Sequence, residues 1–140
     1  MMVTVPIMAR VLFVCLHNAG RSQMSRALFD RAAGGAHTSE SAGSVADPAG
    51  AVHLEVVEVM RELDVDLTDV RPQRLTDEMA ARADVVVTMG CGDACPFVPG
   101  VRYIDWDLPD PKGRPRDEVR ATREEITRRV GALLDDLNGA

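Results

Sequence analysis

The sequence predicts an α/β fold with a small four-stranded parallel sheet and helices on both faces. Residues 11–15 and 85–89 are short, continuous apolar runs, which are typical of strands buried on both faces of a parallel sheet. Segments with helical spacing alternate with the predicted strands, and parallel strands need such crossover connections. A chain of 140 residues is the usual size of one domain, so we predict a single domain over residues 1–140.

The amino-terminal half alternates in this way. After the strand at 11–15 we expect a helix from Ser22 to about Ala33, because two glycines follow it and stop it. A second strand is expected at 36–41, before a polar turn at 41–44. Asp47 is a good N-cap with Pro48 as first helical residue, so the next helix is predicted to run from there to Leu63.

The carboxy-terminal half continues the pattern. Thr76 is followed by two acidic residues, which favour the start of a short helix. Strands are predicted at 85–89 and 101–104, with a loop at 90–100 that contains three glycines and two prolines. A final helix is predicted from Arg116 onward, with apolar residues facing the core.

Composition excludes several classes of function. The net charge of −6 argues against a nucleic-acid partner. No apolar run is long enough to span a membrane, and residues 1–9 are expected to be a loose leader without the features of a signal peptide. The odd count of three cysteines favours working thiols in a reducing cytoplasm.

The segment around Cys15 has the features of an oxyanion-binding loop. Cys15 ends a predicted strand, and Arg21 and Ser22 open the next helix, where backbone N–H groups and the helix dipole favour an anion. The guanidinium of Arg21 can bind two oxygens of a tetrahedral anion, and the same positive field favours a reactive thiolate. We assign oxyanion binding and loop support to Leu16, His17, Asn18, Ala19, Gly20, Arg21 and Ser22. Within that set, Asn18 is expected to brace the loop, Gly20 to let the backbone approach the anion, and Ser22 to donate to the sulfur.

A second cysteine is expected at the same edge of the sheet. Cys91 follows the strand at 85–89 as Cys15 follows the strand at 11–15. Ligands of doubly wound sheets bind at the carboxyl ends of the strands, so both thiols are predicted on one rim. Cys95 lies in the same loop, four residues further on.

The stretch CLHNAGRSQM, from Cys15 to Met24, resembles the phosphate-binding loop of low-molecular-weight protein tyrosine phosphatases. It resembles still more closely that of the arsenate reductases that share their fold. The similarity extends over residues 10–138 and includes 41–43, 83–89 and the Asp110-Pro111 pair. It implies that Cys15 is the nucleophile, that Arg21 clamps the oxyanion, and that Asp110 protonates the leaving oxygen.

The three cysteines match the three-cysteine arsenate reductases, which implies a disulfide relay. Cys15 would attack arsenate, and Cys91 and Cys95 would pass the disulfide to an external thiol reductant, with release of arsenite. The resemblance implies thioredoxin as that reductant. Only three residues separate Cys91 from Cys95, fewer than in better-known members, so a low-molecular-weight thiol with a glutaredoxin-like protein is the alternative. No bound cofactor is expected.

Two other functions fit the same loop. One is a phosphatase acting on phosphotyrosine or a small phosphoester, although Lys112 stands where phosphatases commonly carry an aromatic residue. The other is a non-catalytic oxyanion-binding regulator. Phosphate or sulfate would also fit the site.

No metal site is predicted. Cys91 and Cys95 lack the second ligand pair of a zinc site. Some of the similar reductases hold a potassium ion with a glutamate in the first helix, and Arg26 occupies that position here.

Overall fold

The computed structural model describes residues 8–90 and 98–139, and this part of the chain contains one four-stranded parallel sheet of order β2-β1-β3-β4. The strands are β1 (Arg10–Cys15), β2 (Thr38–Gly43), β3 (Val85–Thr88) and β4 (Arg102–Asp105). The helices are α1 (Arg21–Ala33), α2 (Leu54–Arg61), α3 (Asp77–Arg82) and α4 (Arg116–Leu137). The predicted fold class is therefore confirmed.

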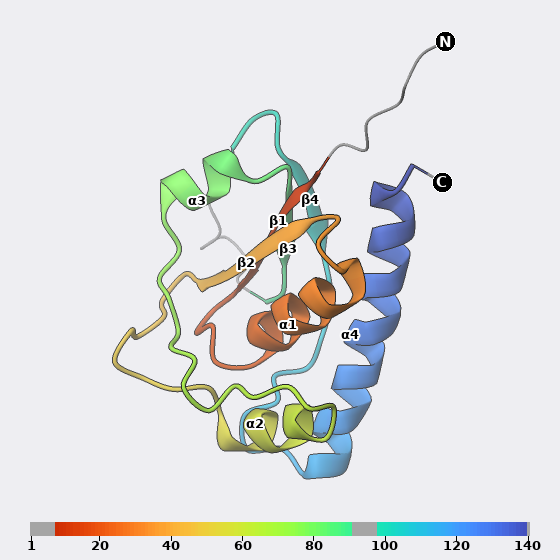
Figure 1. Cartoon of the computed structure of the whole chain (residues 1–140). Coiled ribbons are helices and arrows are strands. Elements are labelled where there is room, and N and C mark those ends of the chain that lie inside the picture. Colours follow the sequence, from red (N-terminus) through yellow and green to blue (C-terminus); the bar gives the residue numbers. More distant parts are fainter. Residues whose placement is uncertain (1–7, 91–97, 140) are drawn as a thin grey trace.

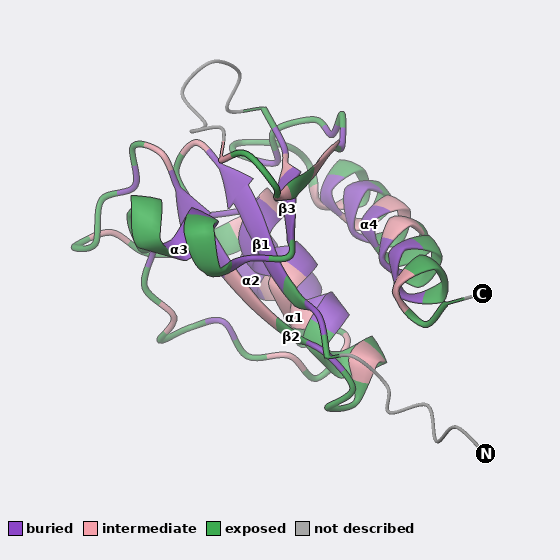
Figure 2. Cartoon of the chain, turned by 90° about the horizontal axis from the view of Figure 1, so that it is seen from above, coloured by how far each residue is buried: buried purple, intermediate pink, exposed green. Residues whose placement is uncertain are grey.

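Helices cover both faces of the sheet (Figure 1). Side chains alternate along β1, so Val11 and Phe13 face a core that includes buried residues of α1, α2 and α4. Leu12 and Val14 face the opposite way, where α3 contributes Met79 and Ala80. Viewed from above, β1 is buried along its length between these layers (Figure 2). Cys15 lies on the α1 side and belongs to the larger core.

Aromatic contacts fix β1 against its surroundings. The ring of Phe13 meets that of Phe29 in α1 edge-on, at 5.6 Å between centroids and 63° between planes. On its other side it lies 5.7 Å from the ring of Trp106, just after β4. Such pairs contribute about 0.5–1.5 kcal/mol beyond their buried area. They hold together the three segments around the carboxyl end of β1.

The predicted start of α2 is wrong. Asp47 and Pro48 form a turn, in which the Ala49 N–H donates to Asp47 Oδ1 (2.9 Å) and the Gly50 N–H donates to the Asp47 carbonyl (2.9 Å). An aspartate followed by proline suits a turn as well as a helix start, and local sequence does not separate the two. The helix begins only at Leu54, after the His53 N–H has bonded the carbonyl of Ala19 (2.9 Å).

The second strand also departs from its prediction. It begins at Thr38 and continues to Gly43, through residues expected in a polar turn. Ser41 pairs with Phe13 and Gly43 with Cys15, so pairing with the buried β1 overrides the weak strand preference of small polar residues. The N-cap predicted for α3 is present, because the side chain of Thr76 accepts a hydrogen bond from the Met79 N–H (3.2 Å).

Two residues of the predicted leader at 1–9, Met8 and Ala9, lie in the described part of the chain. Residues 1–7 lie outside the described part of the chain. Ala9 is buried; its N–H donates to His37 Nδ1 (3.0 Å) and its carbonyl accepts from the Thr38 N–H (3.0 Å). Over residues 8–90 and 98–139, no helix has the length and apolar character needed to cross a membrane.

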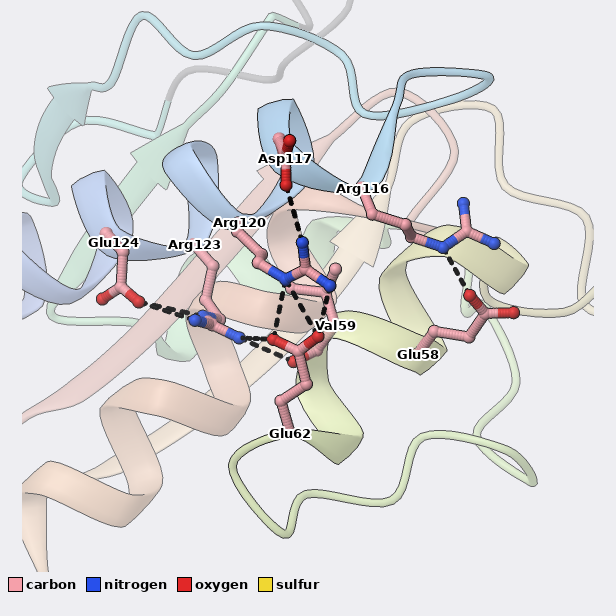
Figure 3. Close-up of polar contacts among 8 residues, drawn as sticks. All are labelled: Glu58, Val59, Glu62, Arg116, Asp117, Arg120, Arg123 and Glu124. Carbon is pink, nitrogen blue, oxygen red and sulfur yellow. Dashed lines mark hydrogen bonds and ion pairs between the residues drawn. The ribbon is translucent and has the colours of Figure 1, made fainter.

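Charged side chains join α2 to α4 (Figure 3). The carboxylate of Glu62 accepts hydrogen bonds from Arg120 (2.9 and 3.0 Å) and from Arg123 Nη1 (2.9 Å). Arg123 is buried and also donates to the carbonyl of Val59 (2.8 Å). The helices are therefore linked by a shared carboxylate as well as by apolar contacts.

Replacing Glu62 with glutamine is expected to remove part of the acid sensitivity of the fold. Hydrogen bonds from Arg120 and then Arg123 lower the pKa of Glu62 from 4.5 to about 2. A carboxyl with a depressed pKa stabilises the fold above its unfolded value, and that contribution disappears as pH falls from about 4.5 to about 2. Urea unfolding from pH 7 to pH 2 would measure it: the gap between wild type and Glu62→Gln should close over this window. Equal pH dependence of the two proteins would contradict the prediction.

Candidate active site

The candidate site lies where the carboxyl ends of the two central strands meet. Cys15 is the last residue of β1 and is only 3% exposed to solvent. The chain leaves β1 toward β2 on one side and later returns to β3 on the other, so the topology reverses at this point. Open parallel sheets bind ligands at such a reversal. Residues 16–20 connect Cys15 to Arg21, the first residue of α1.

A directed series of hydrogen bonds ends on the Cys15 sulfur. The backbone N–H of Gln73 donates to Asn18 Oδ1 (2.9 Å), which fixes the orientation of that amide. Asn18 Nδ2 then donates to Ser22 Oγ (2.7 Å). Ser22 Oγ in turn lies 2.9 Å from Cys15 Sγ, within hydrogen-bond distance; when Cys15 is a thiolate, the hydroxyl is the donor. The series therefore brings a hydroxyl that can donate to a thiolate next to the sulfur.

Asn18 stabilises the loop through hydrogen bonds of its buried side chain. It is fully buried, has a left-handed backbone with φ 53°, and its N–H lies 3.3 Å from Cys15 Sγ as a second donor. Gln23 Nε2 donates both to its carbonyl (3.1 Å) and to its Oδ1 (2.9 Å). Asparagine tolerates positive φ better than most residues, so the backbone and the amide require the same residue type here.

Arg21 reaches across the site. Its side chain is partly buried, and Nη1 donates to the carbonyl of Leu108 (3.1 Å), in the segment that leads to Asp110. The start of α1 also carries Gly20 as N-cap, without a side-chain cap. The N-terminus of α1 therefore presents its backbone donors to the loop.

The Asp110 segment lies directly against the loop. A Cβ built on Gly20 would lie 2.8 Å from Cγ of Pro111, so the glycine permits this approach. The carboxylate of Asp110 is exposed, and its Oδ1 accepts a bond from the Lys112 N–H (3.0 Å). This places the predicted acid one residue from a contact with the loop, in a turn that its own side chain stabilises.

Sequence reasoning missed His53. Burial lowers the pKa of its imidazole below 6.5, the charges of Glu55 and Asp110 oppose the shift, and those of Lys112 and His17 add to it. The imidazole lies beside the loop, since a Cβ built on Gly20 would be 3.5 Å from its Cδ2. No motif around His53 signals this, because the neighbours come from three separate segments.

The positions of Cys91 and Cys95 lie outside the described residues. The described chain ends on this side at Gly90, two residues after β3. Thr88 pairs with Val14, and the Met89 N–H donates to the carbonyl of Val14 (2.8 Å), so β3 ends beside Cys15. Among residues 8–90 and 98–139 no cluster of histidine, cysteine or acidic side chains is arranged to hold a metal.

Cys15 is thus a buried thiol that accepts from a backbone N–H of the following loop, and Arg21 stands at the start of the next helix, which is the arrangement expected of an oxyanion-binding loop. Residues 10–140 match the family model of low molecular weight phosphotyrosine protein phosphatases. The chain belongs to this family.

The relatives with named activities include several arsenate reductases. A protein of Halobacterium salinarum assigned as an arsenate reductase is 39% identical over 129 residues, 90% of this chain and 91% of the relative. Arsenate reductase 1 of Bacillus cereus is 32% identical, over 86% of this chain and 90% of that one. The resemblance to reductases of this fold is thus confirmed.

Solved structures share the fold. A thioredoxin-dependent arsenate reductase of Corynebacterium glutamicum has a TM-score of 0.79 and is 40% identical in sequence. The match covers 93% of this chain and 62% of the Corynebacterium chain. A low molecular weight protein tyrosine phosphatase from T. tengcongensis has a TM-score of 0.82 and 28% identity, covering 91% of this chain and 99% of that one. Both enzyme classes therefore occur on this backbone.

Proposed function

We propose that the protein is an arsenate reductase in which Cys15 is the nucleophile. The observation that carries the proposal is that two relatives near 40% identity are both described as arsenate reductases, whereas the phosphatase structure is 28% identical. The geometry is compatible with it, because the Asn18 N–H donates to the Cys15 sulfur and the Ser22 hydroxyl lies close enough to donate to a Cys15 thiolate.

The first step binds and attacks arsenate. The loop N–H groups and Arg21 hold its oxygens while the Cys15 thiolate forms a bond to arsenic. Asp110 gives a proton to the departing oxygen, which leaves as water. The product is a thioester of arsenate on Cys15, still at the oxidation level of arsenate.

The second step is the reduction. A second thiolate, assigned to Cys91, attacks the Cys15 sulfur and forms a disulfide. The electron pair of the sulfur–arsenic bond passes to arsenic, which leaves as arsenite. Cys95 then attacks the disulfide, frees Cys15 and leaves a Cys91–Cys95 disulfide. One external dithiol, or two thiols, reduces that disulfide and closes the cycle.

The electron donor is a thiol reductant of the cytoplasm. Thioredoxin is the first choice, because a thioredoxin-dependent arsenate reductase is among the structures with this fold. A low-molecular-weight thiol with a glutaredoxin-like protein is the second choice. Both keep thiols reduced in the cytoplasm, where a working disulfide relay can turn over.

Oxidation of NADPH coupled through thioredoxin and its reductase tests the proposal. Arsenate should drive continuous oxidation, and Cys91→Ser and Cys95→Ser should each abolish multiple turnover while Cys15 still reacts once. A phosphoester run in parallel tests the phosphatase alternative. No arsenate-dependent oxidation with either class of reductant, or phosphoester turnover that survives both serine variants without any arsenate reduction, would overturn the proposal.

A further inference from the structure

Gly90 lies against the guanidinium of Arg21. A Cβ built on Gly90 would lie 2.8 Å from Arg21 Nη1, 3.5 Å from Cζ and 3.6 Å from Nη2. Heavy atoms at 2.8 Å without a hydrogen bond overlap, so any side chain at residue 90 requires a movement. The atom to move is the end of a long side chain, so the guanidinium would yield before the backbone of the sheet.

A second neighbour of the guanidinium is the carbonyl of Leu108. Arg21 Nη1 donates to this carbonyl (3.1 Å). Within residues 8–90 and 98–139 the guanidinium has no other hydrogen-bond partner. The guanidinium therefore occupies a slot between the end of β3 and the segment that carries Asp110. The Leu108 carbonyl holds Nη1 by a hydrogen bond, and the absence of a side chain at Gly90 leaves room for the guanidinium there.

We propose that Gly90 is a positioning residue for oxyanion binding: its missing side chain sets the place of the Arg21 guanidinium beside the Leu108 carbonyl. Bidentate binding depends on the direction as well as the charge of the guanidinium, so a displaced Arg21 loses affinity for the anion. The inference rests on the proposed function only for the role of Arg21 in holding the oxyanion. It holds equally if the enzyme prefers a phosphoester.

Gly90 also has φ +81°, so a Cβ there brings backbone strain as well as the contact. Gly100 separates these two effects, because it has φ +89° and a Cβ built on it meets nothing within 4 Å. Gly100→Ala therefore imposes a comparable left-handed strain without touching Arg21. It is the matched control.

The experiment is calorimetric titration of the full chain with inorganic phosphate. Gly90→Ala should raise the dissociation constant about tenfold or more, the cost of one misplaced charge-assisted bond, and Gly100→Ala should change it by less than about twofold. Urea unfolding should show a similar loss of stability in both variants. Gly90→Asn carries the same Cβ with less strain and should weaken phosphate binding as Gly90→Ala does.

A double-mutant cycle shows whether Gly90 acts through Arg21. In an Arg21→Lys background the fold-change caused by Gly90→Ala should shrink toward one, because the fork that it displaces is gone. Three results would each overturn the proposal: phosphate binding by Gly90→Ala and Gly90→Asn at wild-type strength, an equal loss in Gly100→Ala, or an undiminished effect of Gly90→Ala in the lysine background. None of them depends on arsenate reduction, so they are distinct from failure of the proposed function.

Discussion

Asn18→Ala is expected to lower the free energy of unfolding by about 3 kcal/mol, because it removes three hydrogen bonds of a buried side chain, each worth about 1 kcal/mol. The side chain of Gln23 and the backbone N–H of Gln73 both lose Asn18 Oδ1, and Ser22 loses the donor that orients it. Alanine is also strained at φ 53°. Urea unfolding measures the loss, and phosphate titration should show weaker binding because the loop is no longer held.

Asn18→Gly is the control for this prediction. Glycine adopts positive φ without strain but supplies no amide, so the difference between the two variants isolates the backbone cost. Both should lose phosphate affinity. An Asn18→Ala protein within about 0.5 kcal/mol of wild type would contradict the view that the amide is the internal brace of the loop.

Arg21→Lys is expected to lower turnover by about 10²-fold or more while leaving the fold intact. Lysine keeps the positive charge but offers a single ammonium in place of a fork, and loss of one oxyanion donor costs about 10²–10³ in catalysis. Initial rates of arsenate reduction measure the effect. Arg26→Lys, one turn further along α1, makes the same exchange away from the loop and should stay within about twofold of wild type. Equal losses in the two variants would contradict a specific role for Arg21.

Local signals predicted the elements that carry the loop. An apolar run, a short polar segment and a helix follow one another from residue 10 to residue 33, and β1, the loop and α1 form from contacts within that stretch. The alternation of strands and helices then restricts the topology. The predicted start of α2 was wrong because Asp47 forms a turn. The predicted end of β2 was wrong because pairing with β1 extends the strand to Gly43.

The supports of the site come from remote segments and could not be predicted. The Gln73 N–H reaches Asn18 across 55 residues, and the Leu108 carbonyl reaches Arg21 across 87. A backbone group carries no residue-type signal, so no pattern around residues 73 or 108 indicates these contacts. A glycine at residue 90 is also expected in any loop, so the sequence does not show that it lies against Arg21. The roles of Cys15, Arg21, Cys91, Cys95 and Asp110 stay predictions.

The depth of Cys15 determines which molecules can exchange electrons with it directly. Its residue is 3% exposed, beneath a loop held by Asn18. A small tetrahedral anion has far less bulk to bring to so buried a sulfur than the surface of another protein has. Under the proposed relay we therefore expect no mixed disulfide between Cys15 and a protein reductant. Electrons from such a donor would reach Cys15 through the other cysteines of the chain.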